Sequence, residues 1–186
     1  MKIVQAIKAI KDIQKQIDDL MDKVQKYSSD EDDQDPVYGT VEKQTDQISS
    51  WMQAIRDLNA EIERLDYCIK KTNVVTMVTI KLGDKEIKKP IASWIKRGQS
   101  SIGKRGNKRL SLSESDLRAW QCLRENTGRT ETKVVKGKDG GDVVVKFRRY
   151  WDPKKRDEMM KLYASEPSII DGVLEEVNAT VDLIES

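Results

Sequence analysis

The chain has 186 residues, of which 35% are charged and only 5% are aromatic, and its formal net charge is +2. This length suffices for one domain with a hydrophobic core but is short for two full domains. The high charge and low aromatic content exclude a thick globular core throughout, so we expect many solvated helices and exposed loops. The chain contains no His, which excludes the commonest zinc sites and the Ser-His and Cys-His catalytic pairs.

The charges are distributed unevenly along the chain. Residues 1–66 contain 9 Lys/Arg and 15 Asp/Glu, residues 67–156 contain 24 and 9, and residues 157–186 contain 1 and 8. Either the three segments neutralise one another across an assembly, or the basic segment binds an anionic partner. Cys68 and Cys122 are isolated in the sequence, and we expect both to be reduced.

Two segments near the N-terminus show the alternating 3/4 spacing of apolar residues that is typical of coiled coils. The predicted interface residues are Ile10, Ile13, Ile17 and Leu20 in the first segment and Ile48, Trp51, Ile55, Leu58, Ile62 and Leu65 in the second. This stripe of apolar residues is too narrow for a helix that packs on a broad globular core. Each helix therefore needs another helix as its partner. The two helices fold most simply as an antiparallel hairpin, although the same residues can pair between subunits.

The segment SSDEDDQDPVYGT between these helices predicts a loop, because it combines acidic residues with a proline and a glycine. Its carboxylates partly match the spacing of a calcium-binding EF-hand, with Glu31 as the first position. Pro36 then occupies the sixth position, where the sharp turn of an EF-hand requires glycine. We therefore expect no metal site in this loop.

The sequence after the second helix predicts a region that contains strands. Residues 74–82 are rich in β-branched side chains, which is typical of a strand, and Gly83 and Asp84 follow as a turn signal. Pro90 begins a short helix. Trp94 is spaced with neighbouring apolar residues of that helix, so we expect it in the core rather than as a stacking platform for nucleic-acid bases.

Further elements follow towards the C-terminus. Ser113 and Asp116 resemble a capping box at the start of a helix. Residues 131–150 predict a β-hairpin around the glycine-rich turn KGKDGG. Helical signals return at Pro153 and are interrupted near Pro167.

Together these elements predict an α+β fold that is mainly α. We expect a long antiparallel coiled-coil hairpin in residues 1–73, a basic α+β region in residues 74–150, and a C-terminal helical segment in residues 151–186 that packs on the hairpin.

The segment GQSSIGKR, residues 98–105, partly matches a phosphate-binding P-loop. Arg105 stands where the P-loop requires a hydroxyl group, and a helix rather than a buried strand is predicted before the segment, so we expect no nucleotide binding. The surrounding basic residues are candidates for binding an anionic partner: Lys88, Lys89, Lys96, Arg97, Lys104, Arg105, Lys108 and Arg109. We expect them to bind an acidic protein surface, including one on another copy. The alternatives are nucleic acid, whose binding would be salt-dependent, and a basic loop that is only solvated.

Two further segments carry a resemblance. The second helix closes with IERLDYCIKKTN, and the C-terminal segment reads IDGVLEEVNATVDLIE. With the N-terminal heptads, they resemble a family of small uncharacterised proteins of bacteria and tailed phages, some labelled septicolysin. In that family a helical hairpin ends in I-x-x-T-N and a final helix carries L-D-x-x-I-Q-x-x-N-x-T-x-E-L. The residues that match or approximate these motifs are Ile69, Thr72, Asn73, Ile170, Asp171, Leu174, Glu175, Asn178, Thr180, Asp182 and Leu183.

The resemblance covers about half the chain and implies no catalytic residues. The basic residues 83–150 form a longer segment than the equivalent one in that family, so the resemblance implies nothing about their role. The sequence itself contains no recognisable catalytic or cofactor-binding pattern, so we expect no enzyme and no cofactor. We expect a structural protein that forms homo-oligomers, most specifically a tailed-phage virion component of the capsid, neck, tail or baseplate. The alternative is a nucleic-acid-binding protein that uses residues 88–109.

Expected partners are other copies of the chain and other structural proteins. No apolar run reaches spanning length, and the N-terminal segment lacks the pattern of a signal peptide, so no membrane partner is expected. We therefore expect the chain to be cytoplasmic at synthesis, and in the virion if it is encoded by a phage.

Overall fold

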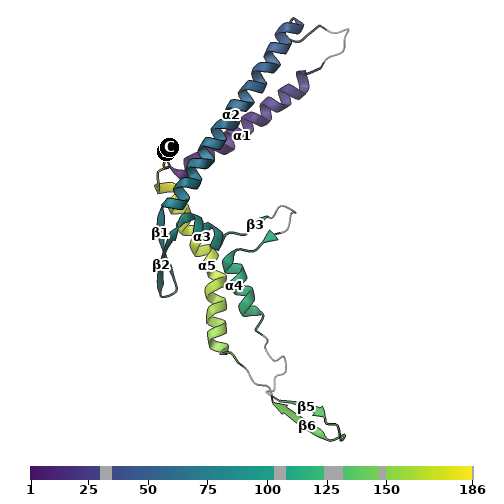
Figure 1. Ribbon diagram of the computed structural model, residues 1–186, viewed down its shortest axis with the longest axis vertical. Helices are drawn as coiled ribbons and strands as arrows, with labels where there is room; N and C mark the ends of the chain where they lie inside the picture. Colours follow the sequence, from purple (N-terminus) through teal and green to yellow (C-terminus); the bar gives the residue numbers. More distant parts are fainter. Residues whose placement is uncertain (30–34, 103–107, 124–131, 147–149, 186) are drawn as a thin grey trace. The chain divides into compact units, whose positions relative to one another are not determined.

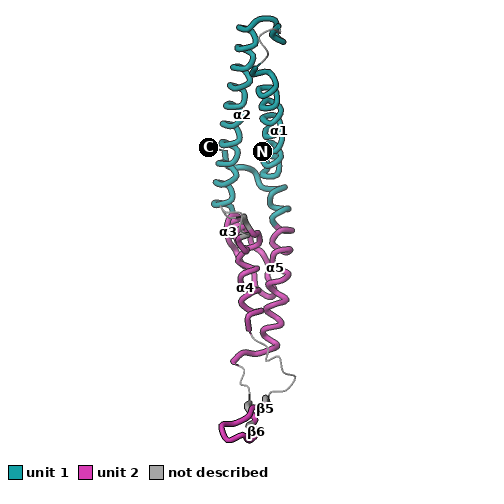
Figure 2. Tube along the Cα trace, turned by 90° about the vertical axis from the view of Figure 1, so that its right-hand side faces the viewer, with its two compact units in different colours: residues 1–76, 174–186 teal, residues 77–173 magenta. Residues whose placement is uncertain are grey.

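The computed structural model describes residues 1–29, 35–102, 108–123, 132–146 and 150–185. The described residues form five helices and three two-stranded antiparallel sheets (Figure 1). The chain is therefore mainly α with a small β content, as the sequence predicts. It divides into two compact units: residues 1–76 with 174–186, and residues 77–173 (Figure 2).

The first unit is built around helices α1 (Ile3–Tyr27) and α2 (Val41–Val75), which lie side by side (Figures 1 and 2). The ring of Tyr27, the last residue of α1, lies 5.8 Å from the ring of Trp51 near the start of α2, as an antiparallel hairpin requires. The side chain of Thr40 caps α2 by accepting a hydrogen bond from the backbone N–H of Lys43.

The core of this hairpin follows the predicted stripe. Of the ten predicted interface residues, four are buried: Ile17, Trp51, Ile55 and Leu65. The other six are half-buried: Ile10, Ile13, Leu20, Ile48, Leu58 and Ile62. The 3/4 spacing therefore identified the side of each helix that turns inward.

The end of α2 departs from the predicted stripe. Cys68 and Thr72 are buried there, whereas Ile69, the next position of the predicted stripe, is only half-buried. The hydroxyl of Thr72 accepts a hydrogen bond of 2.9 Å from the backbone N–H of Ile184. The C-terminal segment thus covers this end of α2, and the two segments that carry the family resemblance meet here.

Residues near the two chain ends are joined within the first unit. The backbone N–H of Leu183 donates to the carbonyl of Met1 at 2.8 Å, and the ammonium group of Lys2 lies 2.7 Å from the carboxylate of Asp182. The hydrogen bond from Lys2 holds the pKa of Asp182 below its ordinary value. We call these four residues the terminal clamp.

The second unit contains the remaining elements. These elements are β1 (Met77–Leu82), β2 (Lys85–Pro90), α3 (Ile91–Gly98), β3 (Ser101–Ile102), β4 (Lys108–Arg109), α4 (Leu112–Gln121), β5 (Thr132–Lys136), β6 (Asp142–Lys146) and α5 (Pro153–Thr180). The last residues of α5, from Leu174 on, belong to the first unit. The strands pair as three antiparallel hairpins, β1 with β2, β3 with β4 and β5 with β6.

The core of the second unit gathers around α3. Trp94 is fully buried, and its indole N–H donates to the carbonyl of Val78 in β1 at 3.0 Å. Trp94 is therefore a core residue with a satisfied polar group, as predicted. Gly98, at the end of α3, packs closely against Ile170 of α5. A Cβ atom at position 98 would lie only 2.9 Å from Cγ2 of Ile170, so a larger residue does not fit without a shift.

Three predicted element boundaries need correction. The first strand begins at Met77 rather than residue 74, because α2 continues through Val75. The capping box of α4 is formed by Ser111 and Glu114, two residues before the predicted pair. Glu is the preferred third residue of this motif, so the sequence did contain the correct signal. Finally, α5 continues through Pro167 without interruption.

Candidate interaction surfaces

The eight predicted partner-binding residues differ in their exposure to solvent. The side chains of three are exposed: Lys88, Lys96 and Arg109. Lys104 and Arg105 lie outside the described residues, and Lys108 is described only by its place in β4. Only these three of the eight predicted residues are therefore shown with basic side chains exposed to solvent.

Arg97 is held inside the second unit. Its guanidinium forms a two-pronged pair with the carboxylate of Glu166, from Nε to Oε1 and from Nη2 to Oε2 at 3.0 Å, and Nη2 also lies 3.2 Å from Asp116. The side chain of Glu166 is only 1% exposed, and that of Arg97 is 19% exposed. Hydrogen bonding to Glu166 raises the pKa of Arg97 further above its ordinary value. Arg97 is therefore a structural residue, which corrects its place in the predicted partner-binding set.

Two further contacts fix the basic side chains near α3. The guanidinium of Arg97 lies 5.9 Å from the ring centroid of Tyr163, and the ammonium of Lys89 lies 5.2 Å from that of Trp94. The hydroxyl of Ser113 also donates to the backbone carbonyl of Arg97 at 2.9 Å. These contacts couple α3 to α4 and α5 and use cationic groups for internal packing.

A groove of about 680 Å³ lies beside the Arg97–Glu166 pair. Apolar side chains line it, including Leu82, Met159 and Leu162, together with charged groups of both signs. Among the described residues, no group of three or more Cys, Asp and Glu side chains is placed to hold a metal ion. None of the described helices combines the length and apolarity needed to cross a membrane.

A second surface lies where the chain enters α2. We call residues 35–47 the hairpin tip. Tyr38 of the tip packs its ring 5.8 Å from the rings of both Tyr27 and Trp51. The backbone N–H of Tyr38 donates to the side chain of Gln44 at 3.2 Å, and Gln44 in turn donates to the carbonyl of Tyr27 at 2.7 Å. The tip is therefore anchored to both helices.

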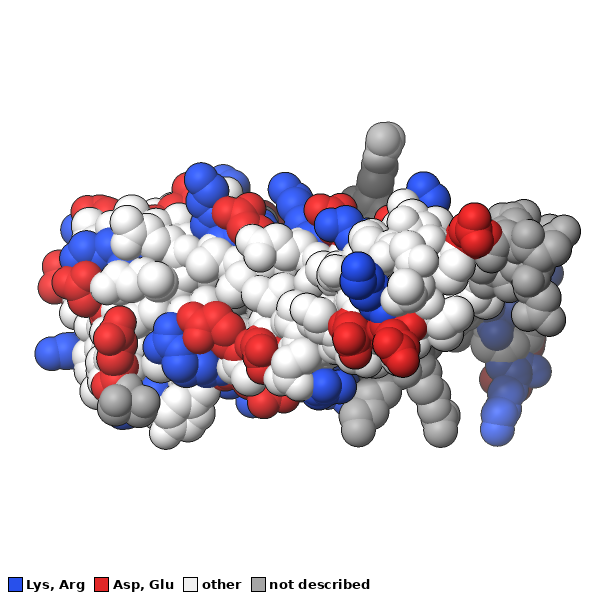
Figure 3. Space-filling model, turned by 90° about the horizontal axis from the view of Figure 1, so that it is seen from above, with Lys and Arg blue, Asp and Glu red and all other residues white. Residues whose placement is uncertain are grey.

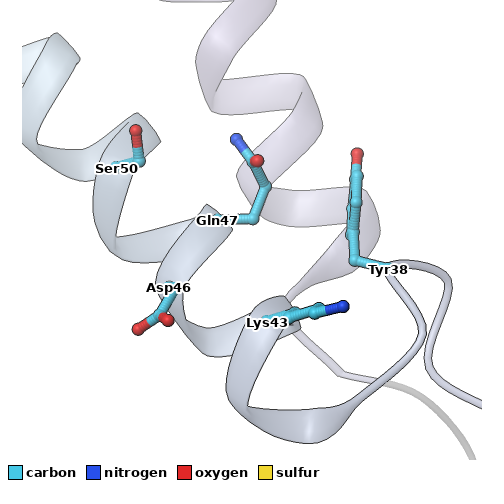
Figure 4. Close-up of a pocket in the computed structure, with 5 residues that line it drawn as sticks. All are labelled: Tyr38, Lys43, Asp46, Gln47 and Ser50. Atoms are coloured by element: carbon cyan, nitrogen blue, oxygen red, sulfur yellow. The ribbon is translucent and has the colours of Figure 1, made fainter.

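The hairpin tip presents a shallow polar depression beside exposed apolar side chains. The depression has a volume of about 420 Å³. Its lining comes from one residue of the turn that precedes α2 and from the first turns of α2, as Figure 4 shows: Tyr38, Lys43, Asp46, Gln47 and Ser50. Val37 and Val41 of the tip are 62% and 72% exposed. Both side chains leave apolar surface open to solvent in a segment that is otherwise anchored to the two helices.

A third surface is formed by β5 and β6 with their connecting turn, residues 132–146, which we call the β-ribbon. Val134 and Val144 lie directly opposite each other in the register and are 58% and 57% exposed. Gly140, in the turn, has a φ of 75°, a conformation that glycine adopts without strain. The predicted hairpin is thus present, and it turns an apolar cross-strand pair to solvent.

The charge asymmetry seen in the sequence follows the two units. The first unit contains 11 Lys/Arg and 19 Asp/Glu, a net charge of −8, and the second contains 23 and 13, a net charge of +10. On the face shown in Figure 3, basic and acidic side chains alternate and are separated by uncharged stretches. The net charges are therefore not concentrated in one patch of a single sign on that face.

Comparison of the chain with protein-family models, with curated proteins and with solved structures gave no match. The family resemblance noted in the sequence therefore stays a prediction, and the surfaces described above are the basis for proposing a function.

Proposed function

We propose that the chain is a non-enzymatic structural protein that acts as an oligomeric building block. The observation that carries this proposal is the incomplete burial of the hairpin interface, where six of the ten apolar residues, including Ile13 and Ile62, remain half-buried. Two helices alone cover only one side of each stripe. Additional helices from another copy would cover the remaining area, and burial of apolar surface contributes about 25 cal/mol per Å².

The opposite net charges of the two units, −8 and +10, also favour association between copies. The resemblance to bacterial and tailed-phage proteins supports the more specific proposal that the building block belongs to a tailed-phage virion. Its partners are then further copies and other structural proteins of the particle.

Light scattering on the purified chain at micromolar concentration and low salt tests the oligomer. We expect a mass of at least two copies. Replacing half-buried interface residues, Ile13→Ser with Ile62→Ser, should shift the mass towards one copy. The matched control, Val4→Ser with Met21→Ser, changes residues of α1 that are 46% and 51% exposed and should leave the mass unchanged. A wild-type monomer under these conditions would overturn the proposal.

A second candidate function rests on the basic second unit, where Lys88, Lys96 and Arg109 are exposed. Such a surface can bind nucleic acid by releasing counterions from the phosphate backbone. This alternative predicts micromolar or tighter binding to duplex DNA of random sequence, with an affinity that falls steeply as salt rises. Replacing the three residues with Gln should flatten that salt dependence while the oligomer survives.

A further inference from the structure

The β-ribbon has the features of an element that is completed by a partner. Among the described residues its sheet has only two strands, so the outer edges of β5 and β6 have no strand beside them. A two-stranded hairpin is marginally stable by itself, and further strands or packing on another element are needed for independent stability. The exposed pair of Val134 and Val144 would gain the most from such packing.

The arrangement of charge on the β-ribbon indicates what kind of partner it has. Val134 and Val144 form an uncharged centre, and the next register pair on the same face, Lys136 with Asp142, places one charge of each sign at the rim. Apolar centres with charged rims are typical of protein interfaces. Nucleic acid would instead favour a basic centre that meets phosphates. The ribbon therefore fits a protein surface with an exposed apolar centre.

The hairpin tip is such a surface. Its exposed apolar residues are Val37 and Val41, with Tyr38 beside them at 36% exposure. The acidic residues around them are Asp35, Glu42 and Asp46, against one basic residue, Lys43. The segment of the β-ribbon has the opposite net charge by composition, because residues 132–146 contain four Lys and two Asp. Both surfaces thus have exposed apolar residues, and the segments that carry these residues have opposite net charge.

We propose that the hairpin tip of one copy binds the β-ribbon of a second copy. The proposal rests on the oligomeric function above and deepens it by naming the two surfaces. Val37 and Val41 would cover the Val134–Val144 pair, while Glu42 and Asp46 would face Lys136 and Lys138 of the ribbon. Each copy carries one surface of each kind, so the contact is either reciprocated in a twofold dimer or repeated from copy to copy in a ring or filament.

Cross-linking between isotopically distinct copies tests the contact directly. Unlabelled and ¹⁵N-labelled chains are mixed, allowed to exchange, and treated with a zero-length carbodiimide, which joins a carboxylate to a lysine only where they touch. We expect peptides that join Glu42 or Asp46 of one isotope to Lys136 or Lys138 of the other. Such mixed pairs are formed only between copies.

A second experiment, with a matched control variant, tests the role of the exposed valines of the β-ribbon. Val134→Lys with Val144→Glu removes the two valines but keeps a favourable cross-strand pair, so the ribbon itself should still form. The control makes the same two changes at Val74 and Val75, which are 63% and 59% exposed and lie outside both surfaces. The ribbon variant should lower the yield of mixed cross-links at least tenfold, and the control should match the wild type.

The outcomes separate this proposal from the oligomeric function. Tip-to-ribbon cross-links of a single isotope only, or an unchanged yield in the ribbon variant, would overturn the tip-to-ribbon contact between copies. An oligomer in light scattering that gives no tip-to-ribbon cross-link would also overturn it, but would leave the oligomeric function standing. A wild-type monomer would overturn both.

Discussion

The substitution Glu166→Gln tests the energetic role of the buried ion pair in the second unit. Glutamine keeps the shape of the side chain but removes its charge, which leaves the guanidinium of Arg97 largely buried beside Asp116 alone. Breaking a buried pair by neutralising one partner costs about 3–5 kcal/mol. Asp116 is 44% exposed and stays within reach at 3.2 Å, so we expect the lower end, about 3 kcal/mol. For a chain of this size, that corresponds to a fall in Tm of about 6–12 °C.

The chain offers a matched control for this experiment. Arg64 and Glu61 form a two-pronged pair of the same kind on α2, with distances of 2.8 Å, but their side chains are 48% and 42% exposed. Because water solvates both groups, Glu61→Gln should barely change the Tm. Thermal unfolding followed by circular dichroism measures both variants, and hydrogen exchange of the amides of α3 and α5 locates the effect in the second unit.

Equal Tm changes in the two variants, or a Glu166→Gln protein that melts within about 2 °C of the wild type, would refute the reasoning about burial. A double replacement gives an independent check. Arg97→Met with Glu166→Leu removes both charges at once, and should recover most of the stability that Glu166→Gln loses, since apolar residues of similar volume replace buried ion pairs at little cost.

Two further predictions follow from other contacts. Gly98→Ala should destabilise the second unit by about 1–3 kcal/mol, because the new methyl group would overlap Ile170; Gly172→Ala, in open space on α5, should leave Tm unchanged or raise it slightly, and equal effects would contradict the close approach at Gly98. The lowered pKa of Asp182 means that its contribution to stability is present above the ordinary Asp value of about 3.9 and is lost as the pH falls through the lowered pKa. The protection of the Leu183 amide, relative to its intrinsic exchange rate at each pH, should therefore fall below about pH 4 in the wild type, whereas Asp182→Asn should show low protection at every pH.

Features encoded by local periodicity could be predicted from the sequence. The 3/4 spacing identified both helices of the hairpin and their inward sides, since a helix repeats its contacts every few residues. Trp94 was assigned to the core on the same ground. The β-ribbon was found from its valine-rich strands and glycine-rich turn, whose backbone conformation favours glycine at Gly140.

Features that depend on distant residues could not be predicted. Arg97 and Glu166 are 69 positions apart, and nothing near either residue reveals that their side chains meet. Glu166 precedes Pro167, a combination that favours a helix end, yet α5 continues because tertiary packing outweighs this local preference. For the same reason, basic residues of identical local appearance, such as Lys96 and Arg97, differ in availability to a partner.

The terminal clamp also constrains the order in which the chain acquires its structure. Lys2 and Asp182 are separated by 180 positions, so their contact cannot form until all the residues between them have left the ribosome. The α1–α2 hairpin needs only nearby residues and can form early, whereas its far end waits for a segment that follows the entire second unit. Contacts of such long separation slow folding, because the intervening chain must first be brought together. The end of α2 around Thr72 therefore stays uncovered until Ile184 has been synthesised, so the first unit is completed only after the whole second unit has been made.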